Sequence, residues 1–215
     1  MKKLTAGTLI VCCLLIFPQF FNCQSRECRE NDATPVFRVK IAADQYFQIV
    51  REKENWQKSA AALMARINQE LQNQGVKAKF EIAEISLWLI NEKSETLEEA
   101  LYDLQMKFPK GDHDLVIGLT RKKFSPKCDA GGYYIFPGYI VARDYAEFDF
   151  NGNEITAFKN WTLNILIHEI GHFFDLDHTN NPDSIMYPKA LGDKFLEEEI
   201  ETINEKAREM KAGAP

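Results

Sequence analysis

Positive charge and long hydrophobic runs are both scarce in this sequence. Its 215 residues include 26 Lys and Arg against 32 Asp and Glu, which gives a formal net charge of −6. Proteins that bind nucleic acid need a basic surface to neutralise phosphates, so this balance argues against a nucleic-acid partner. The one long apolar run lies at the N-terminus, and we therefore expect no membrane-spanning helix in the mature chain. The sequence also lacks internal repeats and low-complexity segments.

The N-terminal apolar run is typical of an export signal. Lys2 and Lys3 form a short positive segment, and the uncharged stretch 9–21 that follows is rich in Leu, Ile, Val and Phe. This layout is that of a secretory signal peptide, and the stretch is shorter than a transmembrane helix. We predict a signal peptide over residues 1–22, a tether over 23–34 and one folded domain over 35–215.

The cysteine at the end of the apolar run leads to a second prediction. Asn22 and Cys23 close the run in a pattern that resembles the bacterial lipobox, whose cysteine becomes the lipidated first residue of the mature protein. The usual pattern has a small residue where Asn22 stands. We predict that Cys23 is lipidated and that membrane contact occurs only through this lipid, at the cell envelope. The alternative is an ordinary signal peptide and an extracellular protein.

Two further cysteines remain in the predicted mature chain. Cys12 and Cys13 lie within the predicted signal and are lost with it, and if Cys23 is lipidated, Cys28 and Cys128 remain as an even pair. In an oxidising compartment such a pair favours a disulfide, which here would join the tether to the domain. The alternative is two unpaired thiols.

Hydrophobic patterning predicts strands that alternate with helices. Apolar and polar residues alternate over 36–42, which suits a half-buried strand, whereas 115–119 is continuously apolar and suits a central strand. Residues 158–174 are apolar nearly all round a helix, which is typical of a buried one. The predicted strands are 36–42, 76–90, 115–119 and two within 131–144, and the predicted helices are 54–72, 96–108, 158–174 and 196–210. This order implies one α+β domain, α/β-like in its alternation, with a mixed sheet.

Local signals mark the ends of some of these helices. Gly75 is a predicted stop for the helix that ends near residue 72, since glycine adopts the left-handed conformation at little cost. Thr96 and Glu99 form a candidate capping box at the start of the next helix. The acidic run 197–199 opens the last helix, and we expect it to be a solvated helix face.

The chemistry is concentrated in the predicted buried helix, where residues 168–172 read His-Glu-Ile-Gly-His. Residues four apart share one face of a helix, so His168 and His172 can reach a single metal ion. Glu169 lies beside the first of these ligands, where its carboxylate can take a proton from a zinc-activated water. Alone, this motif is of moderate specificity, because histidines on helices also serve as hydrogen-bonded core residues.

A third histidine, His178, follows at the spacing that a catalytic zinc site requires. Such a site takes three protein ligands and keeps a fourth position for water. Residues 173–177 supply enough chain to end the helix, turn and return an imidazole to the metal. Three of the four histidines in the chain fall between residues 168 and 178, so chance is a weak alternative.

The stretch from His168 to His178 resembles the metzincin signature HExxHxxGxxH. Residues 184–188, Ser-Ile-Met-Tyr-Pro, are similar to the Met-turn of that family, which places Met186 beneath the metal. The run from His178 to Met186 and the Met-Tyr-Pro ending look most like the matrixin-like branch. The resemblance implies a metzincin-like single domain with a twisted, mixed five-stranded sheet, an active-site helix and a C-terminal helix. It also implies one catalytic zinc ion and a peptide or protein substrate.

Two positions depart from related patterns. Asp175 stands where the metzincin signature has glycine, and Asp is among the few residues that tolerate the positive φ of that turn. Tyr187 follows Met186 directly, whereas the zinc-contacting tyrosine of the astacin-like branch lies one residue further on. We therefore predict that Tyr187 and Pro188 shape the wall of the substrate pocket.

These features together predict a zinc metalloendopeptidase, secreted or lipid-anchored and monomeric, whose catalytic domain spans residues 35–215. One alternative is a non-catalytic zinc-binding surface lipoprotein. The intact Glu169 argues against it, because a structural zinc site has no use for that carboxylate and usually closes its fourth position. A hydrolase that acts on a non-peptide amide also remains open.

Two further regions carry open interpretations. His113 lies between Asp112 and Asp114 and could join a second zinc site or a structural calcium site; the alternative is a solvated loop. Residues 131–140 could provide an edge strand along which an extended peptide aligns through its main chain. The alternative there is an edge that only faces solvent.

Overall fold

The structure is a computed structural model, and it describes residues 33–51, 55–125, 131–145, 160–188 and 192–213. The predicted signal peptide lies outside these ranges, as do Cys23, Cys28 and Cys128, so the predictions on them stay predictions. The described residues from Thr34 onward belong to one compact unit. No helix within them is both long and apolar enough to cross a bilayer.

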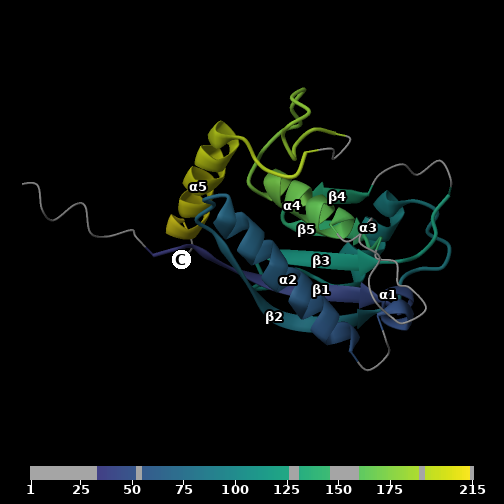
Figure 1. The fold of residues 1–215 in the computed structure, drawn as a ribbon. Helices are drawn as coiled ribbons and strands as arrows, with labels where there is room; N and C mark the ends of the chain where they lie inside the picture. The colour runs from purple at the N-terminus through teal and green to yellow at the C-terminus, as the bar shows by residue number, and fades with distance from the viewer. Residues whose placement is uncertain (1–32, 52–54, 126–130, 146–159, 189–191, 214–215) are drawn as a thin grey trace, which may run out of the picture. The chain divides into compact units, whose positions relative to one another are not determined.

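A five-stranded sheet forms the centre of this unit (Figure 1). Its strands are β1 (Val36–Asp44), β2 (Lys79–Trp88), β3 (Leu115–Thr120), β4 (Gly132–Ile135) and β5 (Tyr139–Arg143). They lie in the order β2-β1-β3-β5-β4, and β4 alone runs antiparallel to its neighbour. The mixed five-stranded sheet implied by the sequence is confirmed, and β4 forms one of its edges.

Helices cover both faces of the sheet. They are α1 (Gln45–Val50), α2 (Trp56–Asn73), α3 (Leu97–Lys107), α4 (Trp161–Phe173) and α5 (Glu197–Ala212). Residues of α2 and α4 share one hydrophobic core with Leu115 and Ile117 of β3, whereas residues of α3 share a second core with Val116. Neighbouring residues of β3 thus point into opposite cores, which confirms β3 as a central strand covered on both faces.

Three local features differ from the sequence-based predictions. Helix α1 follows β1 without a loop and is missed by the patterning; Asp44 caps it by accepting a hydrogen bond from the N–H of Phe47 at 2.6 Å. Alternation predicts a half-buried β1, but its second half is buried on both faces, because Ile41 and Ala43 pack into one core and Ala42 into the other. At α3, Thr96 accepts from the N–H of Glu99 as expected, yet the Glu99 carboxylate accepts from the N–H of Glu95, so the capping box is half formed.

Aromatic side chains hold the C-terminal end of α4 against the sheet. Phe173 and Phe174 pack edge to face on Phe37 of β1, with ring centroids 5.5 and 5.3 Å away. Phe80 of β2 stacks on Phe37 at 5.5 Å and lies 6.3 and 6.1 Å from the rings of Phe173 and Phe174. All four rings are buried, so this end of α4 has little freedom to move.

A buried polar group holds the other end of α4. The hydroxyl of Thr162 donates to the carboxylate of Asp144 at 3.0 Å and accepts from the N–H of Tyr145 at 2.9 Å. Asp144 is in turn bonded by two nitrogens of Arg51, at 3.1 and 2.8 Å, and lies 3.4 Å from Arg121. A helix fixed at both ends is a rigid platform for the side chains between them.

Candidate metal centre and active-site cleft

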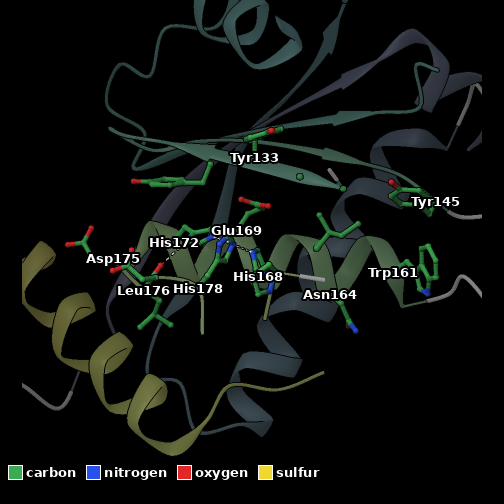
Figure 2. Close-up of a pocket in the computed structure, with 16 residues that line it drawn as sticks. Tyr133, Tyr145, Trp161, Asn164, His168, Glu169, His172, Asp175, Leu176 and His178 are labelled. Atoms are coloured by element: carbon green, nitrogen blue, oxygen red, sulfur yellow. Dashed lines mark hydrogen bonds between the residues drawn. The ribbon is translucent and has the colours of Figure 1, made fainter. Parts of the chain in front are cut away.

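Helix α4 and the turn after it bring the three predicted histidines together (Figure 2). The Nε2 atom of His178 lies 3.1 Å from Nε2 of His168 and 3.2 Å from Nε2 of His172. Three nitrogens bound tetrahedrally to zinc, at Zn–N distances of about 2.0–2.1 Å, would lie roughly 3.4 Å apart. The separation of these atoms therefore fits a single zinc ion.

The second ring nitrogen of two of these histidines is already bonded. Nδ1 of His168 lies 2.6 Å from the carbonyl oxygen of Ile185, and Nδ1 of His172 lies 2.6 Å from that of Leu176. Because a carbonyl only accepts, each Nδ1 donates its proton there and leaves a lone pair on Nε2. Such lone pairs, directed at one point, suit a cation. Within the described residues, no other group of three His, Cys, Asp or Glu side chains is close enough to hold a metal.

Burial favours the neutral form of the imidazoles on α4. Loss of solvation lowers the pKa of His168 to about 4. It also lowers the pKa of His172, and the neighbouring His178 adds to that effect. Neutral imidazole is the form that binds a metal, so this environment suits a metal ligand set.

The turn after α4 is a Schellman motif with Asp175 in the left-handed position. The N–H of Asp175 donates to the carbonyl of His172 at 3.0 Å, and the N–H of Leu176 donates to that of Gly171 at 3.1 Å. Asp175 has a φ of 62°, the single positive φ of a non-glycine residue in the described ranges. The positive φ predicted for Asp175 is confirmed, and this turn brings His178 back to the other two histidines.

Met186 packs directly against α4 below the histidines. Its side chain is fully buried, and a Cβ atom added to Gly171 would lie 2.4 Å from its Sδ. The glycine between the two helical histidines therefore makes room for the Met-turn. The same turn supplies the Ile185 carbonyl that bonds His168.

Glu169 points from α4 toward β4 (Figure 2). A Cβ atom added to Gly132 would lie 2.7 Å from Oε1 of Glu169, and one added to Gly131 would lie 2.6 Å from Cδ1 of Ile165. Two adjacent glycines thus let β4 approach α4 closely. The sequence prediction missed this role, although a glycine pair at the start of a strand pattern is its signal. Burial raises the pKa of Glu169 to about 8, against a backbone hydrogen bond from Tyr134 that lowers it.

The cleft beside these residues has a volume of about 1160 Å³ and is lined by residues of both α4 and β4. The three histidines and Glu169 line its middle. Tyr145 and Trp161, whose rings meet edge to face at 5.6 Å, line one end, and Asp175 lines the other (Figure 2). A large concave site with a few convergent polar groups is typical of a substrate site.

Of the other predicted site residues that the structure describes, one lines the cleft and the rest lie outside it. Pro188 lines the cleft, whereas Tyr187 is not among its lining residues. His113 joins none of the metal-capable groups in the part of the chain that the structure describes. Its neighbour Asp114 is bonded instead by the ammonium of Lys211 and by the backbone N–H of Arg38.

The acidic run at the start of α5 is only partly the solvated face that the sequence predicts. Glu197 and Glu198 are exposed. Glu199 is 8% exposed, and its carboxylate accepts hydrogen bonds from the hydroxyl of Ser184 and the N–H of Leu196. The prediction is therefore wrong for Glu199, because the charge of three adjacent residues does not reveal which of them faces inward.

Comparison with known proteins adds a family match to this geometry. A model for reprolysin-like metallo-peptidases of family M12B matches residues 57–179, from α2 to just beyond His178. No curated protein sequence matches the chain. The family match supports the broad type of metal site that the sequence predicts. The finer assignment to the matrixin-like branch stays a prediction.

Two solved structures share the fold. One, described as a chaperone–substrate complex, is 12% identical with a TM-score of 0.59, and the match covers 84% of this chain and 35% of that one. This chain thus spans about a third of its length. The other, a zinc-dependent peptidase from Methanocorpusculum labreanum, is 15% identical with a TM-score of 0.52, and the match covers 77% of this chain and 100% of that one. At such low identity the likeness shows the fold alone.

Proposed function

The chain belongs to the reprolysin-like M12B metallopeptidase family and is a zinc metallopeptidase, and we propose that it cleaves internal peptide bonds with Glu169 as general base. One zinc ion held by His168, His172 and His178 completes the proposed site. The observation that carries this proposal is the convergence of the three Nε2 atoms, with that of His178 3.1 and 3.2 Å from the other two, beside a buried carboxylate in an open cleft.

The chemistry divides between the metal and the chain. When bound, a zinc ion would polarise the scissile carbonyl, lower the pKa of a water molecule and favour the ionised form of Glu169. The carbonyls of Ile185 and Leu176 hold His168 and His172 in the required tautomer and orientation. These residues keep the ligand set in place while the substrate reacts.

Glu169 moves the proton in the proposed reaction. Its carboxylate takes one proton from the attacking water as the water oxygen bonds to the carbonyl carbon. It then gives that proton to the amide nitrogen as the C–N bond breaks. A carboxylic acid and an amine leave, and Glu169 is a carboxylate again. Gly132 supports this role because its missing side chain leaves space for the Glu169 carboxylate.

Strand β4 supports the binding of an extended substrate. It forms an edge of the sheet and lines the cleft opposite α4. A peptide that pairs with such an edge gains main-chain hydrogen bonds whatever its sequence. A substrate that lies between β4 and α4 has its backbone beside Glu169 and the three histidines.

Export of the enzyme is part of the proposal and rests on the N-terminal sequence pattern. Lys2, Lys3 and the apolar stretch 9–21 support a signal peptide, and Cys23 supports a lipid anchor. Mass spectrometry of the mature N-terminus tests both. A lipidated Cys23 as first residue is the expected result, and an unprocessed Met1 would contradict export through this signal.

Replacement of the proposed base tests the function. We expect Glu169→Ala to lose about 10²- to 10⁴-fold in peptide cleavage, because proton transfer is lost. Its zinc content should match that of the wild type, since all three ligands remain. Cleavage of a peptide library, followed by mass spectrometry with and without a zinc chelator, measures the activity.

Two outcomes of this experiment would count against the proposal. Full activity in Glu169→Ala would remove Glu169 from the mechanism. A wild-type protein that binds zinc but shows no chelator-sensitive cleavage would favour the non-catalytic zinc-binding alternative.

A further inference from the structure

We propose that Glu199, on α5, is a positioning residue for the metal centre and acts through Ser184 and the Met-turn on His168. The proposal rests on the proposed zinc site and extends it to a residue outside the cleft. Glu199 touches neither the cleft nor a histidine, and its carboxylate is buried where α5 meets the Met-turn.

The first link joins Glu199 to Ser184. The Ser184 hydroxyl oxygen lies 2.8 Å from both carboxylate oxygens of Glu199, and both residues are buried. The N–H of Met186 donates to the same hydroxyl oxygen at 2.9 Å. A hydroxyl has one proton, so Ser184 accepts from Met186 and donates to Glu199. The carboxylate of Glu199 only accepts, so it fixes the direction of both hydrogen bonds of the Ser184 hydroxyl.

The second link joins the Met-turn to the metal ligand. Ile185 lies between Ser184 and Met186, the two residues that the first link holds, and its carbonyl accepts from Nδ1 of His168 at 2.6 Å. Partners of this kind orient a ligating imidazole and raise its basicity, and their loss typically costs about 10- to 100-fold in metal affinity or activity. A shift of the Ile185 carbonyl would therefore rotate the His168 ring away from its productive orientation.

The fold is expected to survive the loss of this carboxylate. The N–H of Ile185 donates to the carbonyl of Lys194 at 2.7 Å, and Ser184 and Lys194 form an isolated parallel bridge. These backbone contacts hold the Met-turn near α5 without Glu199. We therefore expect Glu199 to affect how precisely the turn is placed more than whether it forms.

A simpler role for Glu199 is that of a helix cap. Its Oε2 atom accepts from the N–H of Leu196, the residue before α5, at 2.7 Å. A cap stabilises α5 and would leave the metal site unaffected when the rest of the fold is intact. Ser184 separates the two roles, because its side chain bonds Glu199 and Met186 but takes no part in the cap.

The test measures zinc affinity and stability in the full mature chain. The variants are Glu199→Gln, Ser184→Ala and the double variant, with Glu198→Gln as control. Glu198 is exposed in the same first turn of α5, so its replacement makes the same change in charge near the helix terminus. Competition with a chromogenic chelator gives the zinc dissociation constant, and thermal unfolding in excess chelator gives the stability of the metal-free fold. The visible spectrum of the Co²⁺-loaded protein reports the ligand geometry.

We expect Glu199→Gln and Ser184→Ala each to weaken zinc binding about 10-fold and to alter the Co²⁺ spectrum. The double variant should be weakened by much less than the product of the two, because both changes break one chain of contacts. Glu198→Gln should match the wild type. Peptide cleavage at saturating zinc gives an independent second readout.

Unchanged zinc affinity in the variants would overturn the proposal. Wild-type zinc affinity in Ser184→Ala, or in a Glu199→Gln that unfolds at a lower temperature, would leave Glu199 as a helix cap. If Glu199→Gln fails to fold, Ser184→Ala alone decides between the two roles. A wild-type chain that binds no zinc would overturn the proposed function as well. Normal zinc binding by the wild type and by both variants would overturn only the positioning role of Glu199.

Discussion

At the scale of single residues, Gly132 shows how closely β4 is packed against Glu169 of α4. Its φ is not positive, so an alanine there meets no backbone obstacle, but its Cβ atom would lie 2.7 Å from Oε1 and 2.9 Å from Cγ of Glu169. Glu169 is buried and cannot move away at little cost. The absence of a side chain at Gly132 therefore bears directly on the proposed role of Glu169.

We expect Gly132→Ala to keep its zinc and to lose about 10- to 100-fold in kcat, since small misplacements of a catalytic group are costly. Steady-state peptide cleavage and metal analysis of the same preparation check this. Gly213→Ala is the control, because a Cβ atom there has its nearest neighbour at 3.6 Å. Wild-type activity in Gly132→Ala would show that Glu169 is not held against β4.

Asp175 marks how far single residues can be predicted from the sequence. Its positive φ follows from the residue type, which is visible in the chain, and from the resemblance to a signature that has glycine at this position. Its ion pair with Lys206 of α5, at 2.5 Å, is not. No periodic pattern connects residues so far apart, and the side chain of Asp175 is 62% exposed, so the pair contributes little stability.

At the scale of elements, the position of α4 depends on the aromatic group at its C-terminal end. Phe37 is fully buried and contacts the rings of Phe80, Phe173 and Phe174. We expect Phe37→Ala to lower the free energy of unfolding by about 3–5 kcal/mol, the usual cost of such a deletion in a core. Denaturant unfolding measures it.

Phe136→Ala is the matched control for this prediction. Phe136 is 79% exposed, and we expect a change within about 0.5 kcal/mol. Equal effects of the two variants would mean that the ring of Phe37 is not part of the packing that holds α4.

Most of the larger elements are predictable because their burial leaves an apolar pattern or an apolar run in the sequence. β3 lies between two cores and α4 is buried nearly all round, so both appear as apolar segments in the sequence. Helix α1 is not predictable in this way, since it has six residues, one of them buried, and starts directly from β1. The inward side of α5 at Glu199 also escapes the pattern, because a buried carboxylate has the sequence signature of an exposed one.

At the scale of the whole molecule, the pH dependence of stability includes a contribution from a buried acid outside the metal centre. Asp44 lies at the end of β1 and is fully buried. Burial raises the pKa of its carboxyl, against hydrogen bonds from Thr120 and from the N–H groups of Phe47 and Arg121. A raised folded-state pKa means that protonation of Asp44 favours the folded state. This contribution to stability is complete below the ordinary aspartate pKa and is lost as the pH rises through the folded-state value.

We therefore expect the stability of the wild type, relative to Asp44→Asn, to fall as the pH rises from below the ordinary aspartate pKa to above the raised one, because asparagine does not titrate. Unfolding free energies of both proteins across this range measure the difference. The absolute stability of Asp44→Asn also reflects its changed hydrogen bonds, so the slope of the difference is the relevant quantity. A difference that is constant or rises with pH would contradict the raised pKa.

The fold class and the site histidines were accessible from the sequence for different physical reasons. The alternation of strands and helices follows from burial, and a metal site requires ligands at a spacing that the backbone geometry dictates. The contacts that orient those ligands come from carbonyls and from distant segments, such as Ile185 and Glu199, and carry no local signature. These contacts are visible only once the chain is folded.

The zinc content of the purified protein, compared with that of His178→Ala, tests the three-histidine centre most directly. We expect about one zinc per wild-type chain and a large loss of zinc in the variant after dialysis against a weak chelator, because two imidazoles bind zinc far more weakly than three. Circular dichroism of both proteins controls for folding. Equal, stoichiometric zinc in a folded His178→Ala would contradict the account and remove His178 from the metal site.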